Sequence, residues 1–299
     1  MRETFVIMAG GTGGHVFPGL ALADELRSAG YHVAWLGTEA GIESRLVPKA
    51  GYDLYFLPVS GVRGKGVLAL LKAPLMIAKA LFSAFSALRK IQPVAVVGFG
   101  GFAAGPGAIA AKLLGKPLLL HEQNSVLGTT NSILQHLADR RLEGFPDTFK
   151  KRKGTFFTGN PVRQDIVALL KTSQCNVEPA ADRSSCRILI VGGSRGARAL
   201  NEQIPALIQR LSGESKVGLE VWHQTGDAER NATQKRYEQL GIEARVDAFI
   251  DVMAESYQWA DLVVCRAGAM TVAEVAAAGV GALFVPFPAA VDDHQTRNA

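Results

Sequence analysis

The same succession of elements opens both halves of the chain. Residues 4–9 (TFVIMA) form an uninterrupted apolar run with the length of a buried strand, and GGTGGH follows at 10–15 before a helical pattern begins near Pro18. In the second half, RILIV at 187–191 leads into GGSRGA at 192–197 and another helical pattern. A strand, a glycine-rich loop and a helix in succession are typical of Rossmann-like α/β folds. The sequence therefore predicts two doubly wound parallel sheets, one in each half.

The spacing within both glycine loops differs from that of a dinucleotide-binding loop. The pattern G-x-G-x-x-G, read from Gly11, is met at Gly13 but has Val16 in the position of the third glycine. The loop that follows residues 187–191 fails the same test. We therefore rank an NAD-dependent dehydrogenase last among the enzymes that this fold supports.

Length and composition favour two globular domains. The 299 residues exceed one ordinary core, and 48% apolar with 20% charged residues is typical of a folded protein. A net charge of +5 favours an anionic surface or substrate but is too small to predict nucleic-acid binding. Three cysteines without C-x-x-C spacing predict neither a disulfide framework nor a zinc site. A polar stretch follows Arg163, so we expect domains at 1–163 and 164–299.

Three predicted strands of the first half end in loops suited to a ligand. These loops are GGTGGH at 10–15, GFGGFAAGP at 98–106 and HEQN at 121–124. The carboxyl ends of parallel strands meet at one edge of the sheet, where doubly wound proteins bind ligands. At this edge His15 has two interpretations. It is either a general base, a role that histidine fills near neutral pH, or a polar residue with satisfied hydrogen bonds and only a packing role.

The segment 261–285 predicts a second ligand site. An apolar strand at 262–265 is followed by a small-residue turn and then by a helix headed by Thr271. Free N–H groups at such a helix start suit a phosphate, and Glu274, one turn later, suits the two hydroxyls of a ribose. The alternative is that Thr271 is only the N-cap residue and Glu274 its capping-box partner.

The most apolar segment, residues 62–91, also has two interpretations. Lys72, Pro74 and Lys79 interrupt it, so we do not expect it to span a membrane. A helix with apolar residues such as Phe82, flanked by lysine and arginine, fits an element that lies on an anionic membrane surface. The alternative is a core helix with a lysine-rich outer face. The chain start lacks the pattern of a signal peptide.

Seven segments carry a resemblance to a known family. In chain order they are GGTGGHVFP at 10–18, GFGGFAAGP at 98–106, HEQN at 121–124, GNPVR at 159–163, GGSRGA at 192–197, RAGAMTVAE at 266–274 and DHQTRNA at 293–299. Together they resemble the MurG family of peptidoglycan glycosyltransferases. The resemblance implies the GT-B architecture, an α/β fold in which two Rossmann-like domains face a cleft. It implies an acceptor- and membrane-facing domain at 1–163 and a UDP-sugar-binding domain at 164–299. Because members of the family continue for several more elements, we expect this second domain to be incomplete.

The resemblance also implies an activity. Its members transfer N-acetylglucosamine with inversion from UDP-N-acetylglucosamine to lipid I, which gives lipid II for peptidoglycan and thereby serves cell-wall biogenesis, cell shape and cell division. It implies no cofactor, no obligatory divalent metal, no nucleic acid as partner, and a peripheral location on the cytoplasmic face of the inner membrane.

The family's functional residues fall on positions of this chain that match its motifs. The implied substrate-binding residues are Thr12, Gly13, Gly14, Asn124, Arg163, Ser194, Ile250, Ala269, Met270, Thr271, Val272, Ala273, Glu274 and Gln295. His15 is the first candidate for activating the acceptor hydroxyl, and Glu122 is the second.

Two alternatives remain open at this point. One is an enzyme similar to UDP-N-acetylglucosamine 2-epimerase, which shares the architecture and the donor but uses no lipid acceptor. The other is an inactive, truncated protein that binds a nucleotide sugar at the membrane. Turnover of the UDP sugar without an acceptor would favour the first, and binding without transfer would favour the second.

Overall fold

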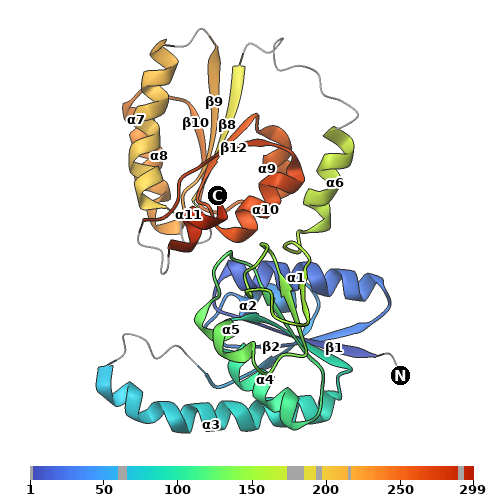
Figure 1. The fold of residues 1–299 in the computed structure, drawn as a ribbon. Helices are drawn as coiled ribbons and strands as arrows, with labels where there is room; N and C mark the ends of the chain where they lie inside the picture. Colours follow the sequence, from blue (N-terminus) through green and yellow to red (C-terminus); the bar gives the residue numbers. More distant parts are fainter. Residues whose placement is uncertain (1–2, 60–65, 174–184, 193–196, 215–216, 289–292) are drawn as a thin grey trace. The chain divides into compact units, whose positions relative to one another are not determined.

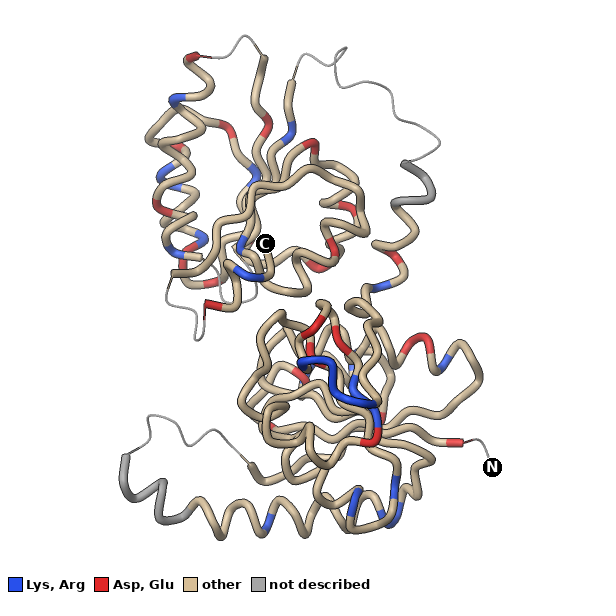
Figure 2. The backbone as a smooth tube through the Cα atoms, in the orientation of Figure 1, with Lys and Arg blue, Asp and Glu red and all other residues tan. Residues whose placement is uncertain are grey.

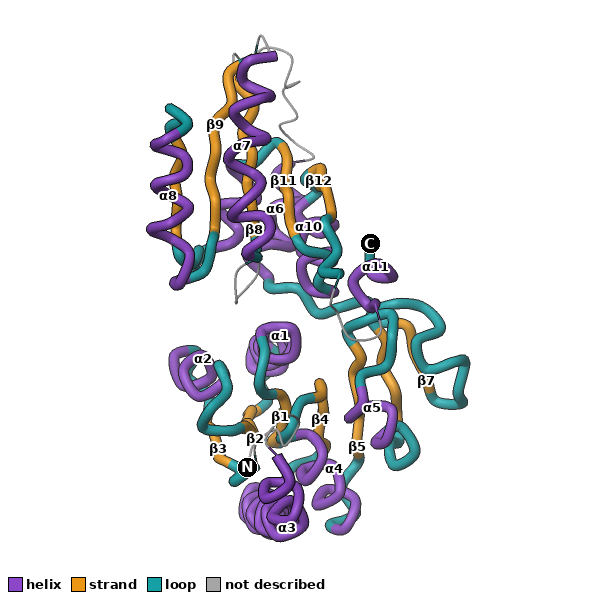
Figure 3. Tube along the Cα trace, turned by 90° about the vertical axis from the view of Figure 1, so that its left-hand side faces the viewer, coloured by secondary structure: helices purple, strands orange, loops and turns teal. Residues whose placement is uncertain are grey.

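A computed structural model describes residues 3–59, 66–173, 185–192, 197–214, 217–288 and 293–299 (Figure 1). At 66–72 and 170–173 it describes the backbone alone. The chain divides into two compact units, Met1–Pro161 and Val162–Ala299. Each unit contains one parallel sheet with helices on both faces (Figure 3). The prediction of two Rossmann-like α/β sheets is therefore confirmed.

The sheet of unit 1 has seven strands in the order β3-β2-β1-β4-β5-β6-β7, and neighbouring strands are parallel throughout. The strands are β1 (Thr4–Ala9), β2 (His32–Gly37), β3 (Asp53–Phe56), β4 (Ala95–Gly100), β5 (Leu118–Glu122), β6 (Arg140–Glu143) and β7 (Thr155–Phe157). The strand order runs in opposite directions from β1 and from β4. The carboxyl ends of β1 and β4 thus form the topological switch point, the place where such sheets bind ligands.

Both faces of this sheet are covered, because alternate residues of each strand point to opposite sides. The helices are α1 (Gly13–Ser28), α2 (Glu43–Lys49), α3 (Gly66–Ile91), α4 (Ala104–Leu113) and α5 (Thr129–Leu134). On one face Ile7 and Trp35 pack beneath α1. On the other, Met8 packs against α4, in one cluster with Ala84 and Leu88 of α3. The two apolar layers fix the register of the strands and hence of the loops at their carboxyl ends.

The expected start of the first helix near Pro18 is wrong, since α1 begins at Gly13 and Pro18 lies inside it. The carbonyl oxygen of Thr12 accepts hydrogen bonds from the N–H groups of His15 and Val16, at 3.1 and 3.2 Å. The helix therefore begins within the glycine loop itself. As a consequence, His15 is held by helical backbone instead of lying in a free loop.

The sheet of unit 2 has five parallel strands in the order β10-β9-β8-β11-β12. They are β8 (Ser185–Val191), β9 (Gly218–Gln224), β10 (Ala244–Asp247), β11 (Leu262–Cys265) and β12 (Gly281–Phe284). The helices are α6 (Gln164–Ser173), α7 (Arg198–Glu214), a short 3-10 turn (Asp227–Glu229), α8 (Arg230–Gln239), α9 (Met253–Trp259), α10 (Ala269–Ala278) and α11 (His294–Asn298). Two apolar clusters, one on each face, make this unit a second core.

Within the described residues, no helix combines the length and apolar character needed to cross a membrane. The longest of them, α3, has Pro74 inside it, so this proline interrupts the apolar run of the sequence but not the helix. On the side that packs against the rest of unit 1, α3 buries Ala80, Ala84 and Leu88, which are spaced four residues apart. The opposite side of α3 is left exposed.

Candidate functional site

Two glycine loops of unit 1 contact each other at the switch point. A side chain on Gly101, where φ is +79°, would collide with the carbonyl oxygen of Gly10. A Cβ atom on Gly100 would lie 3.1 Å from Cε1 of His15. The pairing of β1 with β4 shifts register between Met8 and Ala9, immediately before these loops. Glycine is therefore required here so that two backbones and one imidazole ring can share the space.

Glu43, in the first turn of α2, holds the backbone of the first glycine loop through hydrogen bonds to its carboxylate. Its carboxylate is fully buried and accepts hydrogen bonds from the N–H of Gly11 (2.9 Å), the N–H of Thr38 (2.8 Å) and the hydroxyl of Thr38 (2.6 Å). A Cβ atom on Gly10 would lie 2.5 Å from Oε1 of this carboxylate. Sequence reasoning missed Glu43, because an acid in the first turn of a helix is ordinarily explained by the helix dipole.

His15 is half-buried and belongs to a row of polar side chains. Its Nδ1 atom lies 3.0 Å from Oε1 of Gln123, and Nε2 of Gln123 lies 3.2 Å from Nδ1 of His121. Nε2 of His121 lies 3.1 Å from the carbonyl oxygen of Gly159. Burial lowers the pKa of His121 to about 4. In the described part of the chain, Nδ1 is the only ring nitrogen of His15 with a hydrogen bond.

Glu122 has its two carboxylate oxygens fully engaged with neighbouring residues. Oε1 accepts hydrogen bonds from the backbone N–H and the side-chain amide of Asn124, and Oε2 accepts from the N–H of Gly128 and the amide of Asn131. The side chain is only 2% exposed. This carboxylate shapes the turn after β5 and positions Asn124.

In unit 2 the helix start that the sequence singled out lies two residues earlier than expected. Helix α10 begins at Ala269, and its N-cap is Gly268. The first intrahelical bond runs from the N–H of Val272 to the carbonyl of Gly268, at 2.9 Å. The N–H groups of Ala269, Met270 and Thr271 precede that bond and have no acceptor within the helix. Three first-turn amides are thus available to an anion.

The capping-box alternative is wrong, because Thr271 is not the N-cap residue and Glu274 does not face an N-cap amide. Glu274 instead accepts a hydrogen bond from Arg163 (3.3 Å) and another from the hydroxyl of Tyr257 (3.1 Å). Burial raises the pKa of Glu274, and both partners act in the opposite direction. Arg163 immediately precedes α6, which packs against α10, so this ion pair ties two helices together.

Several of the remaining predicted residues closely follow a strand in the chain. Thr12, the N-cap of α1, and Gly14 are exposed, whereas Gly13 is buried. Ile250 follows β10, and its N–H donates to Oε1 of Gln224 at 3.2 Å. Gln295, in α11, accepts a hydrogen bond from the N–H of Phe287 through Oε1. The predicted residue Ser194 lies outside the described residues.

Comparisons with known proteins match both halves of the chain. The model of the glycosyltransferase family 28 N-terminal domain matches residues 5–142, and that of the family 28 C-terminal domain matches residues 187–299. A relative from Methylococcus capsulatus is 51% identical over 100% of this chain and 82% of its own length. One from Xylella fastidiosa is 52% identical over 98% of this chain and 79% of its own length. Each is named UDP-N-acetylglucosamine–N-acetylmuramyl-(pentapeptide) pyrophosphoryl-undecaprenol N-acetylglucosamine transferase.

The solved structures agree with these matches. The crystal structure of Acinetobacter baumannii MurG superposes with a TM-score of 0.76 at 42% identity, and it covers 99% of this chain and 81% of its own. This chain belongs to the MurG family. A structure named UDP-N-acetylglucosamine 2-epimerase superposes with a TM-score of 0.62 at 15% identity, which shows only that it shares the fold of the MurG-family chain.

Three residues of this MurG-family chain that organise the site were given no role from the sequence. Glu43 bonds to Gly11, 32 residues away, Tyr257 bonds to Glu274 in another helix, and Gln123 was noted only as part of HEQN. The partner of Gln123 is 108 residues distant, and that of Tyr257 is 17 residues distant. No local sequence pattern marks such residues. For Gln123 alone there was a usable signal, because it directly follows a predicted strand.

Proposed function

We propose that this chain transfers N-acetylglucosamine, with inversion, from UDP-N-acetylglucosamine to lipid I and so forms lipid II. The observation that carries the proposal is an identity of 51–52% over 98–100% of the chain to transferases bearing that name. The reaction is a step of peptidoglycan biosynthesis, on which cell-wall growth, cell shape and division depend.

The donor is bound through the groups at the carboxyl edge of the unit 2 sheet. The first-turn amides of Ala269, Met270 and Thr271 donate hydrogen bonds to the diphosphate, which also lies at the positive end of the helix dipole. Glu274 accepts hydrogen bonds from the ribose hydroxyls, and Arg163 holds the carboxylate for that task. The backbone near Ile250 recognises the uracil.

The remaining substrate contacts are assigned by family membership and chemistry. Gln295 and Asn124 carry amides that suit sugar hydroxyls. Thr12, Gly13 and Gly14 contribute from the first glycine loop, and Val272, Ala273 and Ser194 complete the set.

His15 is the general base in this proposal. Its Nε2 atom is free of described hydrogen-bond partners, and the ring is half-buried at the switch point. Glu122 is a positioning residue instead, because both of its oxygens already accept two hydrogen bonds each. His15 removes the proton from the acceptor hydroxyl as that oxygen attacks the sugar carbon. The negative charge that develops on the leaving diphosphate is stabilised by the amides of α10.

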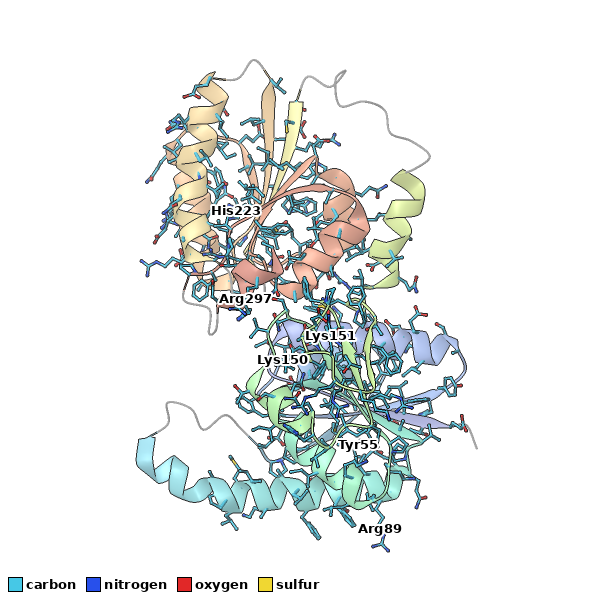
Figure 4. The ribbon with its side chains drawn as sticks, in the orientation of Figure 1. Tyr55, Arg89, Lys150, Lys151, His223 and Arg297 are labelled. Carbon is cyan, nitrogen blue, oxygen red and sulfur yellow. The ribbon has the colours of Figure 1, made fainter. Side chains whose placement is uncertain are left out.

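We further propose that α3 lies on the cytoplasmic surface of the inner membrane. Leu75 and Phe82, seven residues apart, are 62% and 76% exposed, and Lys79 and Arg89 are exposed on the same helix. Basic residues recur along α3 (Figure 2), and Arg89 projects away from the sheet (Figure 4). An apolar stripe edged with cations suits an anionic lipid surface.

The test is transfer of labelled N-acetylglucosamine from the UDP sugar to a lipid I analogue by this 299-residue chain, with EDTA present. Formation of lipid II analogue supports the proposal. Turnover of the UDP sugar in the absence of acceptor would support an epimerase-like activity instead. Saturable UDP binding without product would contradict the proposed transfer by this chain.

A further inference from the structure

Four groups of unit 1 form a continuous chain of hydrogen bonds that ends on His15. The carbonyl oxygen of Gly159 contacts Nε2 of His121 at 3.1 Å, and Nδ1 of His121 contacts Nε2 of Gln123 at 3.2 Å. Oε1 of Gln123 then contacts Nδ1 of His15 at 3.0 Å. His121 and Gln123 are 2% and 1% exposed, so the bond between them is shielded from water, and each of the two outer bonds has one buried partner.

The chemistry of each group fixes the direction of this chain. A carbonyl oxygen only accepts, so the proton of His121 lies on Nε2, facing Gly159. Because the buried ring of His121 stays neutral at pH 7, its Nδ1 atom presents a lone pair, which only a donor satisfies.

The amide of Gln123 is that donor, and two acceptors on His121 fix its orientation. Its Nε2 atom faces the Nδ1 lone pair of His121 and also donates to the carbonyl oxygen of His121, at 3.1 Å. Both of these partners accept, so the NH₂ group of Gln123 points at His121 and the oxygen points at His15. The amide oxygen in turn requires a proton on Nδ1 of His15.

We infer that His121 and Gln123 are positioning residues that hold His15 in the tautomer protonated on Nδ1, with the lone pair on Nε2. The inference rests on the proposed function, in which that lone pair accepts the proton of the acceptor hydroxyl. Gly100 completes the arrangement, since a Cβ atom there would lie 3.1 Å from Cε1 and 3.3 Å from Nδ1 of His15. The ring is thus held at Nδ1, while Nε2, the nitrogen that would react, has no hydrogen bond to the described residues.

A spectroscopic measurement tests the tautomer directly. The full chain, labelled with ¹⁵N in its six histidines, is examined at pH 8 by long-range ¹H–¹⁵N correlation, and a His15→Asn variant assigns the His15 signals. We expect the pattern of a neutral ring protonated on Nδ1. A ring protonated on Nε2, or a mixture of both tautomers, would overturn the inference.

The variant Gln123→Met tests the cause, because it keeps the length of the side chain but removes both the donor and the acceptor. We expect His15 to become a mixture of tautomers, and kcat to fall at least about tenfold while KM for the UDP sugar changes less than about twofold. The matched control is Gln135→Met, at a buried glutamine that bonds to Ser132. It should leave both the tautomer and kcat unchanged.

The outcomes separate this inference from the proposed function. If His15 keeps one tautomer in Gln123→Met, the positioning role is overturned whatever the activity. If the tautomer is as expected but His15→Ala retains full turnover, His15 is not the base and the tautomer assignment still holds. If the chain transfers no sugar at all, the proposed function fails while the spectrum still decides the tautomer.

Discussion

Glu43 shows how one buried side chain determines the shape of a ligand loop. Its carboxylate has three donors within 2.9 Å, and no cation is among its hydrogen-bond partners in the described residues. A buried carboxylate is stabilised by such donors, and an amide cannot replace it, because an amide has one acceptor oxygen and adds a donor. The shape of the loop at 10–14 therefore depends on a residue more than 25 positions away.

We therefore expect Glu43→Gln to destabilise unit 1 by about 1–3 kcal/mol, because an amide NH₂ would face the N–H of Gly11 or Thr38. The free energy of unfolding in urea measures this. The control is Glu39→Gln, at an exposed position just before α2. A loss below about 0.5 kcal/mol would show that the loop is held by other contacts.

His15→Ala should lower kcat about 10²–10⁴-fold, the typical contribution of a general base, with little change in UDP binding. The assay is transfer to the lipid I analogue at saturating donor. His32→Ala is the control, because His32 is exposed and pairs only weakly with Asp53, at 3.9 Å. A loss below about tenfold at His15 would assign the base elsewhere.

At the scale of single elements, strands were easier to predict than helix starts. Residues 262–265 are β11 with the bounds expected from their apolar run, because a buried strand needs that run whatever surrounds it. Helix starts depend on which carbonyl accepts the first bond. Thr12 and Gly268 accept it here, so α1 and α10 begin before Pro18 and Thr271, the residues that the local patterns favoured.

The candidate site was likewise predictable only in part from the sequence. The loops at the ends of β1, β4 and β5 were predictable, because parallel strands bring their carboxyl ends together. The pairing of Glu274 with Arg163 and Tyr257 was not, since it depends on how α6, α9 and α10 pack. Sequence pattern therefore places a site at the edge of a sheet, while packing decides which side chains serve it.

For helix α3 we expect the double variant Leu75→Glu, Phe82→Glu to reduce binding to vesicles of anionic phospholipid at least about tenfold, since each side chain would lose about 1.5–3 kcal/mol of apolar burial. Co-sedimentation with vesicles at low salt measures the bound fraction. Leu211→Glu, on the exposed side of α7, is the control. Equal partitioning of the double variant and the wild type would contradict the assignment of α3.

At the scale of the whole molecule, each unit buries a neutral histidine within its own core. His223, on β9, lies inside unit 2 (Figure 4) and contacts the hydroxyl of Tyr237 at 3.0 Å and Oδ1 of Asn201 at 3.1 Å. Burial lowers the pKa of His223 to about 3, and that of His121 in unit 1 to about 4. Unfolding returns both to about 6.5, so the unfolded chain binds more protons between these values.

Both units should therefore be fully stabilised by these histidines above about pH 6.5 and lose that stability as the pH falls toward 4 and 3. Each histidine contributes a slope of at most about 1.4 kcal/mol per pH unit. Urea unfolding between pH 4 and 7 measures it. His223→Gln should flatten the slope for unit 2, whereas His32→Gln, at an exposed position, should leave it unchanged. An unaltered slope in His223→Gln would show that His223 is not the group that titrates.

The contact between Gly101 and the carbonyl of Gly10 also limits how this protein can evolve. Repacking of side chains cannot make room for a new side chain at Gly101, because the obstacle is the backbone of Gly10. A substitution at Gly101 therefore requires a change in the backbone of the other loop as well. A Cβ atom added to Gly105, only four residues further on, would have no neighbouring group within 4 Å. A saturation scan of function should therefore find that Gly101 tolerates no side chain, whereas Gly105 tolerates alanine.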